Sequence, residues 1–124
     1  MANTPFFFFR IGNTSYSESG LSAIKEVIKV QKFALGQVMV TRGVYDLMMA
    51  SMAFAAFVNI SLDRYSSGDW GILTDEDKHQ NEVALFTGER LMGSYELKGE
   101  DGWKIWIITE WDRSVTTILF PDEY

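Results

Sequence analysis

The sequence predicts an α+β fold, with an antiparallel sheet of about five strands and helices packed on one of its faces. Short runs of aromatic and β-branched residues, separated by turn residues, fill the last third of the chain and predict a three-stranded meander there. Two earlier stretches have the spacing or the composition of helices. With 124 residues, 47% of them hydrophobic, we expect a single domain over residues 1–124.

The N-terminal part should contribute two strands and one short helix. Residues 6–11 begin with four phenylalanines and form the first expected strand, and residues 33–40 form the second. Residues 12–20 have the composition of a loop. The spacing that follows predicts an amphipathic helix, capped by Ser19 or Ser22, whose inward positions are Leu21, Ile24, Val27, Ile28 and Gln31.

Residues 44–65 are the most apolar stretch, and their content of Ala, Met and Leu favours a helix, broken near Ser51 into two. A membrane span needs about 20 nearly uncharged residues. The uncharged run over residues 47–58 is shorter, so we expect a core helix and no membrane partner. The alternative is an exposed stripe of Met and Phe residues that joins two copies of the chain as a homodimer.

Residues 66–71 form a tight loop in which two glycines flank Asp69 and Trp70. The loop either presents Trp70 as a binding tip or buries it as a plug between helices. A helix should follow, because Thr74 is a suitable cap and three acidic residues lie in the first turn. It should end at Gly88, and the residues expected near its inward end are Val83, Leu85 and Phe86.

The meander comprises strands over residues 89–97, 103–110 and 115–120, and Pro121 ends the last one. Both faces of its middle strand carry large apolar side chains, which predicts a central strand covered in part on both sides. The two faces consist of Trp103, Ile105, Ile107 and Thr109, and of Lys104, Trp106, Ile108 and Glu110.

Charge is divided unevenly along the chain. Residues 1–62 hold five basic and three acidic residues, whereas residues 63–124 hold six basic and fourteen acidic ones. An acidic half disfavours binding to nucleic acid or anionic lipid and favours a basic protein partner. The alternative is a negatively charged surface that only keeps the protein in solution. The absence of cysteine excludes disulfides and is typical of the reducing cytoplasm.

Catalytic signals are sparse. The single histidine, His79, shares a helical face with three acids and could form a metal site or an acid–base pair, or simply belong to a solvated helix; the acids are Asp75, Glu76 and Glu82. No distant segment offers a further ligand, so we expect neither a metal nor another cofactor. Nucleophile, phosphate-loop and metalloprotease motifs are absent from the sequence.

Carboxylates and tryptophans also gather around the last expected turn. Glu110 and Asp112, with Trp106 and Trp111, could line a ligand pocket. The simpler interpretation is a set of turn residues with Arg113 paired locally.

The half of the chain from about residue 64 onward resembles a family of small bacterial proteins carried on plasmids, phages and other mobile elements. The resemblance rests on residues 67–71 (SGDWG), 75–78 (DEDK) with Asn81, Ala84 and Leu85, 104–110 (KIWIITE), 112–114 (DRS), 116–121 (TTILFP) and Glu123 with Tyr124. Such proteins often carry the label "type I restriction endonuclease subunit M" or "plasmid-related protein". That label does not describe this chain, which lacks the Pro-Pro catalytic motif and the cofactor-binding loop of a DNA methyltransferase.

The resemblance implies a mobile-element setting, where small acidic proteins often counter host defence. Our leading hypothesis is a non-enzymatic cytoplasmic protein that inhibits a host defence complex, of the anti-CRISPR or anti-restriction type, by occupying a basic surface. The alternatives are a small enzyme or ligand-binding domain that uses Trp106, Trp111, Glu110 and His79, and a homodimeric plasmid-maintenance module. The partner-binding residues expected in the leading hypothesis are Asp69, Trp70, Asp75, Glu76, Asp77, Glu100, Asp101, Glu110 and Asp112.

Overall fold

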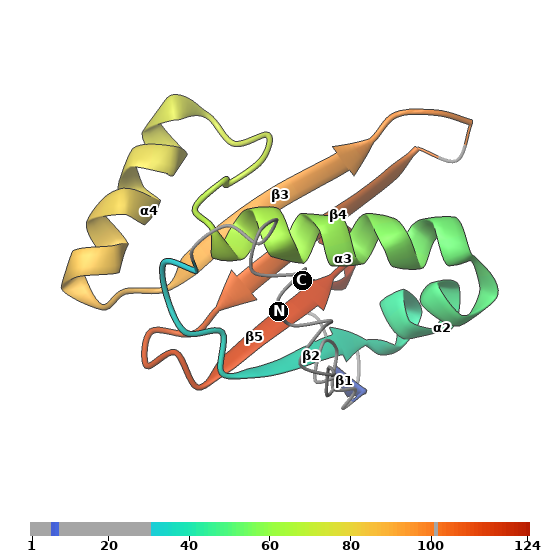
Figure 1. The fold of residues 1–124 in the computed structure, drawn as a ribbon, viewed down its shortest axis with the longest axis horizontal. Helices are drawn as coiled ribbons and strands as arrows, with labels where there is room; N and C mark the ends of the chain where they lie inside the picture. Colours follow the sequence, from blue (N-terminus) through green and yellow to red (C-terminus); the bar gives the residue numbers. More distant parts are fainter. Residues whose placement is uncertain (1–5, 8–30, 101) are drawn as a thin grey trace, which may run out of the picture.

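The computed structural model describes residues 6–7, 31–100 and 102–124 and has an α+β fold (Figure 1). Most of the first expected strand, the whole expected helix over residues 21–31 except Gln31, and Asp101 lie outside the described residues. The elements, in chain order, are β1 (Phe6–Phe7), β2 (Gln37–Thr41), α2 (Arg42–Ala50), α3 (Met52–Ser66), α4 (Asp75–Thr87), β3 (Leu91–Leu97), β4 (Trp103–Thr109), β5 (Val115–Leu119) and the 3-10 helix η1 (Pro121–Glu123).

The strands form one sheet in the order β1-β2-β5-β4-β3, in which β1 is only two residues long. The predicted C-terminal meander is confirmed, because β3, β4 and β5 pair antiparallel in sequence order. The prediction of an antiparallel sheet is wrong at one seam, where β2 and β5 run parallel. Short turns force antiparallel pairing between consecutive strands, but nothing local fixes the direction of β2 against a strand so distant in sequence.

Strand β2 begins later than predicted, at Gln37 rather than at residue 33. Gly36 adopts a positive φ of 64°, and a Cβ atom there would collide with the carbonyl groups of Arg113 and Ser114. The Gln37 amide donates to the Ser114 carbonyl, so the chain joins the sheet only after this bend. Phe33 packs instead against the helix side, with its ring 5.2 Å from the ring of Tyr65.

The predicted break near Ser51 is confirmed. Ser51 has an extended backbone, with φ −139° and ψ 114°, and its amide donates to the Leu47 carbonyl at the end of α2. Its hydroxyl accepts a hydrogen bond from the Phe54 amide at the start of α3. One serine therefore ends one helix and caps the next.

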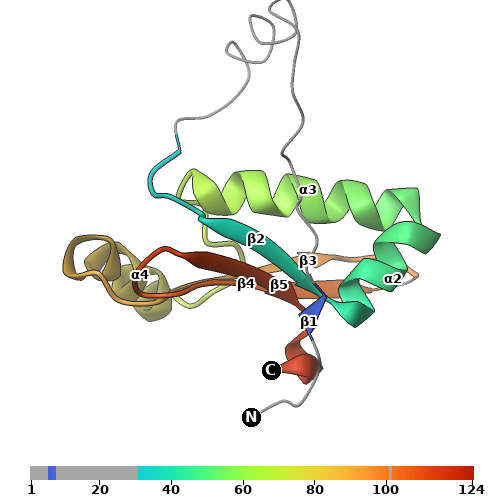
Figure 2. The same cartoon turned by 90° about the horizontal axis from the view of Figure 1, so that it is seen from below.

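Helix α3 covers one face of the sheet (Figures 1 and 2). The core lies between them, and its completely buried members include Val40, Val44, Phe54, Val58, Tyr65, Leu91, Tyr95, Ile105, Ile107 and Ile118. On the opposite face of β4, Ile108 is buried and Trp106 packs edge-on against the ring of Tyr124, 5.7 Å away. The expectation that β4 is central and partly covered on both sides is confirmed.

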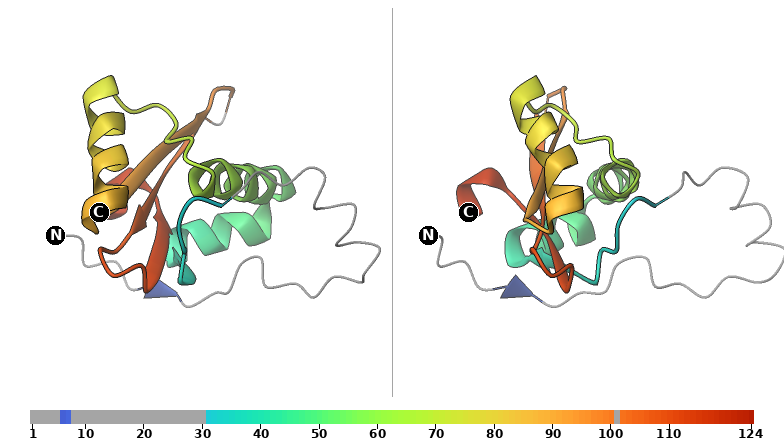
Figure 3. Two further views of the ribbon diagram at one scale, coloured as in Figure 1. Left: turned by 60° about the vertical axis from the view of Figure 1, so that its left-hand side comes forward. Right: turned by 90° about the vertical axis from the view of Figure 1, so that its left-hand side faces the viewer.

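The helices do not all lie on one face, as the sequence led us to expect. Helix η1 lies on the side of the sheet opposite α3, and α4 lies beside the edge strand β3 (Figures 2 and 3). A chain of buried hydroxyl groups joins α3 to the sheet. Tyr65 donates to Thr109 over 2.7 Å, the hydroxyls of Thr109 and Thr116 are 2.8 Å apart, and Thr116 donates to the Leu35 carbonyl. Burial raises the pKa of the Tyr65 phenol, which therefore stays protonated and able to donate.

We expect Tyr65→Phe to lower the free energy of unfolding by about 1–3 kcal/mol, because the buried Thr109 hydroxyl loses its donor. Urea denaturation measures the change. Tyr124→Phe is the matched control, since the Tyr124 hydroxyl meets Arg90 at the surface and should contribute less than about 1 kcal/mol. Equal losses of unfolding free energy in the two variants would show that the buried chain of hydroxyl groups does not stabilise the fold.

Candidate functional site

Asp69 is held inside its own loop. Its carboxylate receives two hydrogen bonds from Arg64, with Nε–Oδ2 2.7 Å and Nη2–Oδ1 3.2 Å, and a third from the Gly71 amide. Its carbonyl accepts a hydrogen bond from the Tyr95 hydroxyl over 2.6 Å. The hydrogen bond to Asp69 raises the pKa of Arg64. Asp69 is therefore an anchor of the loop, with a half-exposed carboxylate that is already paired.

Trp70 is buried, with only 3% of its surface exposed. The indole Nε1–H donates to Glu82 Oε2 over 2.7 Å, and the ring packs against Phe33 and Tyr65. The interpretation of Trp70 as a plug is confirmed, and the alternative of an exposed binding tip is wrong. Trp70 is thus removed from the residues that can touch a partner, because its hydrogen bond and ring contacts are all satisfied within the chain.

Helix α4 begins and ends where the sequence predicts. The Thr74 hydroxyl accepts a hydrogen bond from the Asp77 amide, and Gly88 ends the helix with a left-handed φ of 74°. Three exposed carboxylates occupy the first turn, where their negative charge interacts favourably with the helix dipole. They belong to Asp75, Glu76 and Asp77.

The inward face of α4 differs from the prediction. Asn81 and Ala84 are its only buried residues, while Val83 is 42% exposed and Phe86 is 92% exposed. The Asn81 side chain exchanges two hydrogen bonds with the backbone of Met92 in β3. Of the residues predicted to lie inward, Leu85 is partly buried and packs against the core, whereas Val83 borders the groove and Phe86 faces outward.

Arg113 joins α4 to the turn between β4 and β5. Its guanidinium donates to four carbonyl groups, those of Ala84, Glu89, Glu110 and Trp111, at 2.6–3.3 Å. The predicted local pairing of Arg113 is therefore only part of its role. These bonds hold Trp111, which is 68% exposed, beside the last turn of α4.

The two acidic residues near this turn, Glu110 and Asp112, interact with side chains of the same chain. Asp112 accepts hydrogen bonds from the hydroxyl and the amide of Ser114, and these lower the pKa of its carboxyl group. Glu110 lies 3.8 Å from Arg90, which also donates to the Tyr124 hydroxyl.

The predicted acidic residues do not form one patch. Glu100 lies in the turn before β4, whereas Glu110 and Asp112 lie in the turn after it. The seven residues of β4 separate these turns by about 23 Å. The fold therefore does not bring Glu100 together with Glu110 and Asp112, and Asp101 lies outside the described residues. Asp75, Glu76 and Asp77 remain together on α4.

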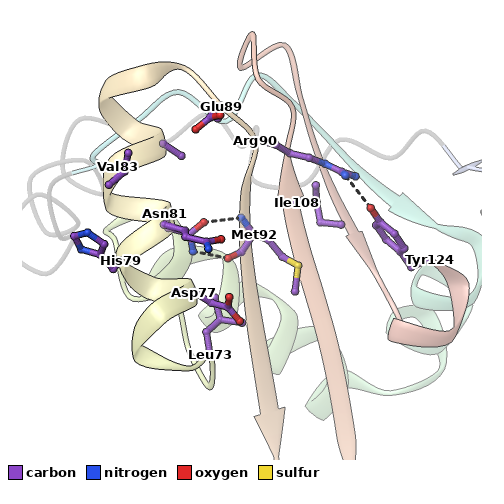
Figure 4. Close-up of a pocket in the computed structure, with 12 residues that line it drawn as sticks. Leu73, Asp77, His79, Asn81, Val83, Glu89, Arg90, Met92, Ile108 and Tyr124 are labelled. Carbon is purple, nitrogen blue, oxygen red and sulfur yellow. Dashed lines mark hydrogen bonds between the residues drawn. The ribbon is translucent and has the colours of Figure 1, made fainter.

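A groove of about 620 Å³ separates α4 from the sheet (Figure 4). The predicted tryptophan-lined pocket does not coincide with this groove, because neither Trp106 nor Trp111 lines it. His79 reaches only its rim and points away from β3 (Figure 4). Within the described ranges, no group of three or more acidic or histidine side chains is placed to hold a metal ion. The lining residues are Leu73, Asp77, His79, Gln80, Asn81, Val83, Ala84, Glu89, Arg90, Met92, Ile108 and Tyr124.

The Met- and Phe-rich stretch is divided between core and surface. Phe54 and Phe57 are buried, which confirms the expected core helix, while Met52 at the start of α3 is 91% exposed and Met49 in α2 is also exposed. A homodimer through this surface stays a prediction, and light scattering would test it by a mass near twice the 14.1 kDa of the chain.

Comparisons with protein-family models, curated proteins and solved structures found no match to this chain. The resemblance to mobile-element proteins therefore stays a prediction. In the part of the chain that the structure describes, none of the helices combines the length and the apolar character needed to cross a membrane.

Proposed function

We propose that the protein is a non-enzymatic inhibitor that binds a basic surface of a host defence complex, of the anti-CRISPR or anti-restriction type. The exposure of α4 is the observation that supports this proposal. The helix buries only two residues and exposes both the acidic first turn and Phe86. We refer to Asp75, Glu76, Asp77 and Phe86 as the α4 surface.

The chemistry of this surface suits a protein partner. Carboxylates on a projecting helix attract a basic partner and speed its association at low salt. The exposed aromatic ring of Phe86, at the other end of the same helix, offers an anchor that a pocket on the partner can bury, as aromatic residues do at binding hot spots. A second exposed aromatic residue, Trp111, lies in the turn that Arg113 ties to the Ala84 carbonyl of the helix. The mobile-element setting comes from the sequence resemblance alone.

We expect neutralisation of the first turn, as D75N/E76Q/D77N, to weaken binding by about tenfold or more at low salt, since three carboxylates lose their attraction for a basic surface. The partner is first captured from host lysate at low and high salt, identified by mass spectrometry and purified. Titration calorimetry then compares the variants over a range of salt concentrations.

The matched control is D46N/D63N/E96Q, which removes the same charge from exposed positions elsewhere on the fold. It should leave affinity nearly unchanged, because these positions lie on α2, α3 and β3 and not on α4. Equal affinity and equal salt dependence in the native protein and the α4 variant would refute the electrostatic mechanism.

A further inference from the structure

The groove has an apolar floor and two different walls (Figure 4). Met92 of β3 and Ile108 of β4 form the floor. Helix α4 forms one wall, with Asp77 and Glu89 toward its two ends, and Arg90 with Tyr124 forms the other (Figure 4). A volume of about 620 Å³ is within the range of sites that hold a drug-sized ligand or several side chains.

The edge of β3 is closed to an added strand over its first half. The Asn81 side chain forms hydrogen bonds with both backbone groups of Met92: Nδ2 donates to the carbonyl, and Oδ1 accepts from the amide. The Ser94 amide donates to the Trp70 carbonyl, and the Ser94 carbonyl accepts from the Ile72 amide. A partner segment at this place cannot bind by extending the sheet. A segment bound here must instead make its contacts by placing its side chains in the groove.

The charges of the groove favour a cationic occupant. The only guanidinium in its lining belongs to Arg90, which is engaged with Glu110 and with the Tyr124 hydroxyl on its own wall. The carboxylates in the lining belong to Asp77, in the first turn of α4, and to Glu89, which follows the helix and accepts a hydrogen bond from the Thr87 hydroxyl. Residues 77–87 of a helix span about 15 Å, which is the length of about five residues of an extended chain.

We propose that this groove receives a short, extended, basic segment of the protein partner. An apolar side chain of the segment rests on Met92 and Ile108, and basic side chains on either side of it reach Asp77 and Glu89. The inference rests on the proposed function, since it assigns the chemistry of the partner segment that lies against the inner side of α4. It adds a contact in the groove to those that the proposed function assigns to the α4 surface.

Selection of a random peptide library, displayed on phage, against the full-length protein tests the inference. We expect the enriched peptides to carry an apolar residue with Lys or Arg at about two residues on each side. A synthetic peptide from this set should bind Met92→Gln at least tenfold more weakly than the native protein, by fluorescence anisotropy. Tyr124→Ser, on the opposite wall, provides a second variant, and Met52→Ser, at the exposed start of α3 and outside the groove lining, should leave peptide affinity unchanged.

Each other outcome overturns the inference. Failure to enrich peptides, enrichment of acidic peptides, or equal affinity for the native protein, Met92→Gln and Tyr124→Ser would exclude a basic segment in the groove. Loss of peptide binding in Phe86→Ser alone would move the contact to the α4 surface and leave the proposed function standing. If the purified partner binds the groove variants normally but fails to bind D75N/E76Q/D77N, the groove assignment is wrong and the proposed function survives.

Discussion

Gly71→Ala is expected to destabilise the protein by about 3–5 kcal/mol, which is a large fraction of the stability of an ordinary domain. Gly71 has a positive φ of 80°, and an added Cβ would collide with the Ser94 carbonyl. That carbonyl cannot move away, because it accepts the Ile72 amide in the bridge that holds the loop against β3. Strain in the backbone and a clash with another backbone group therefore act together.

Urea denaturation with circular dichroism measures this loss. Gly88→Ala is the matched control, because Gly88 has a similar φ of 74° but no neighbouring atom within 4 Å of an added Cβ. It should cost only the left-handed backbone penalty, about 1–2 kcal/mol. Similar losses in the two variants would show that the bridge between Gly71 and Ser94 does not constrain the loop.

Arg113→Lys is expected to release α4 from the sheet. The lysine keeps the charge and the unfavourable φ of 60°, but it cannot reproduce the planar fork that reaches four carbonyl groups. We expect a loss of about 2–3 kcal/mol, with the largest increase in hydrogen exchange at the amides of α4 and of the turn after β4. Hydrogen exchange followed by mass spectrometry measures both segments.

Arg42→Lys is the control for this substitution. Arg42 makes one exposed ion pair with Asp46, at 3.9 Å, and its replacement should change neither stability nor exchange. If exchange in α4 is unchanged by Arg113→Lys, the contacts of Asn81, Glu82 and Ala84 are sufficient to hold the helix.

The sequence predicted the features that depend on neighbouring residues, namely the helix ends and the C-terminal meander. Thr74 and Gly88 fixed the ends of α4, and Ser51 fixed the break between α2 and α3, because a cap acts on atoms a few residues away. The meander was predictable since its strands are joined by short turns.

What the sequence did not reveal depends on contacts between distant segments. Asn81 and Arg113 are unremarkable polar residues until the fold brings the Met92 backbone and the Ala84 carbonyl to them. Hydrophobic spacing therefore placed Phe86 inward, although polar anchors hold the helix and leave Phe86 exposed. The groove was missed for the same reason, because Met92 and Tyr124 face it from strands and helices that are far apart in sequence.

The parallel seam between β2 and β5 has a consequence for the order of folding. Gln37 and Val115 pair across this seam although 78 positions separate them, whereas Leu97 and Trp103 pair across a turn with a separation of six. By loop-closure entropy, the first contact costs about 4 kcal/mol and the second about 1.6 kcal/mol. The meander can therefore form early as a local unit, and the docking of β2 onto it is the step expected to limit the folding rate.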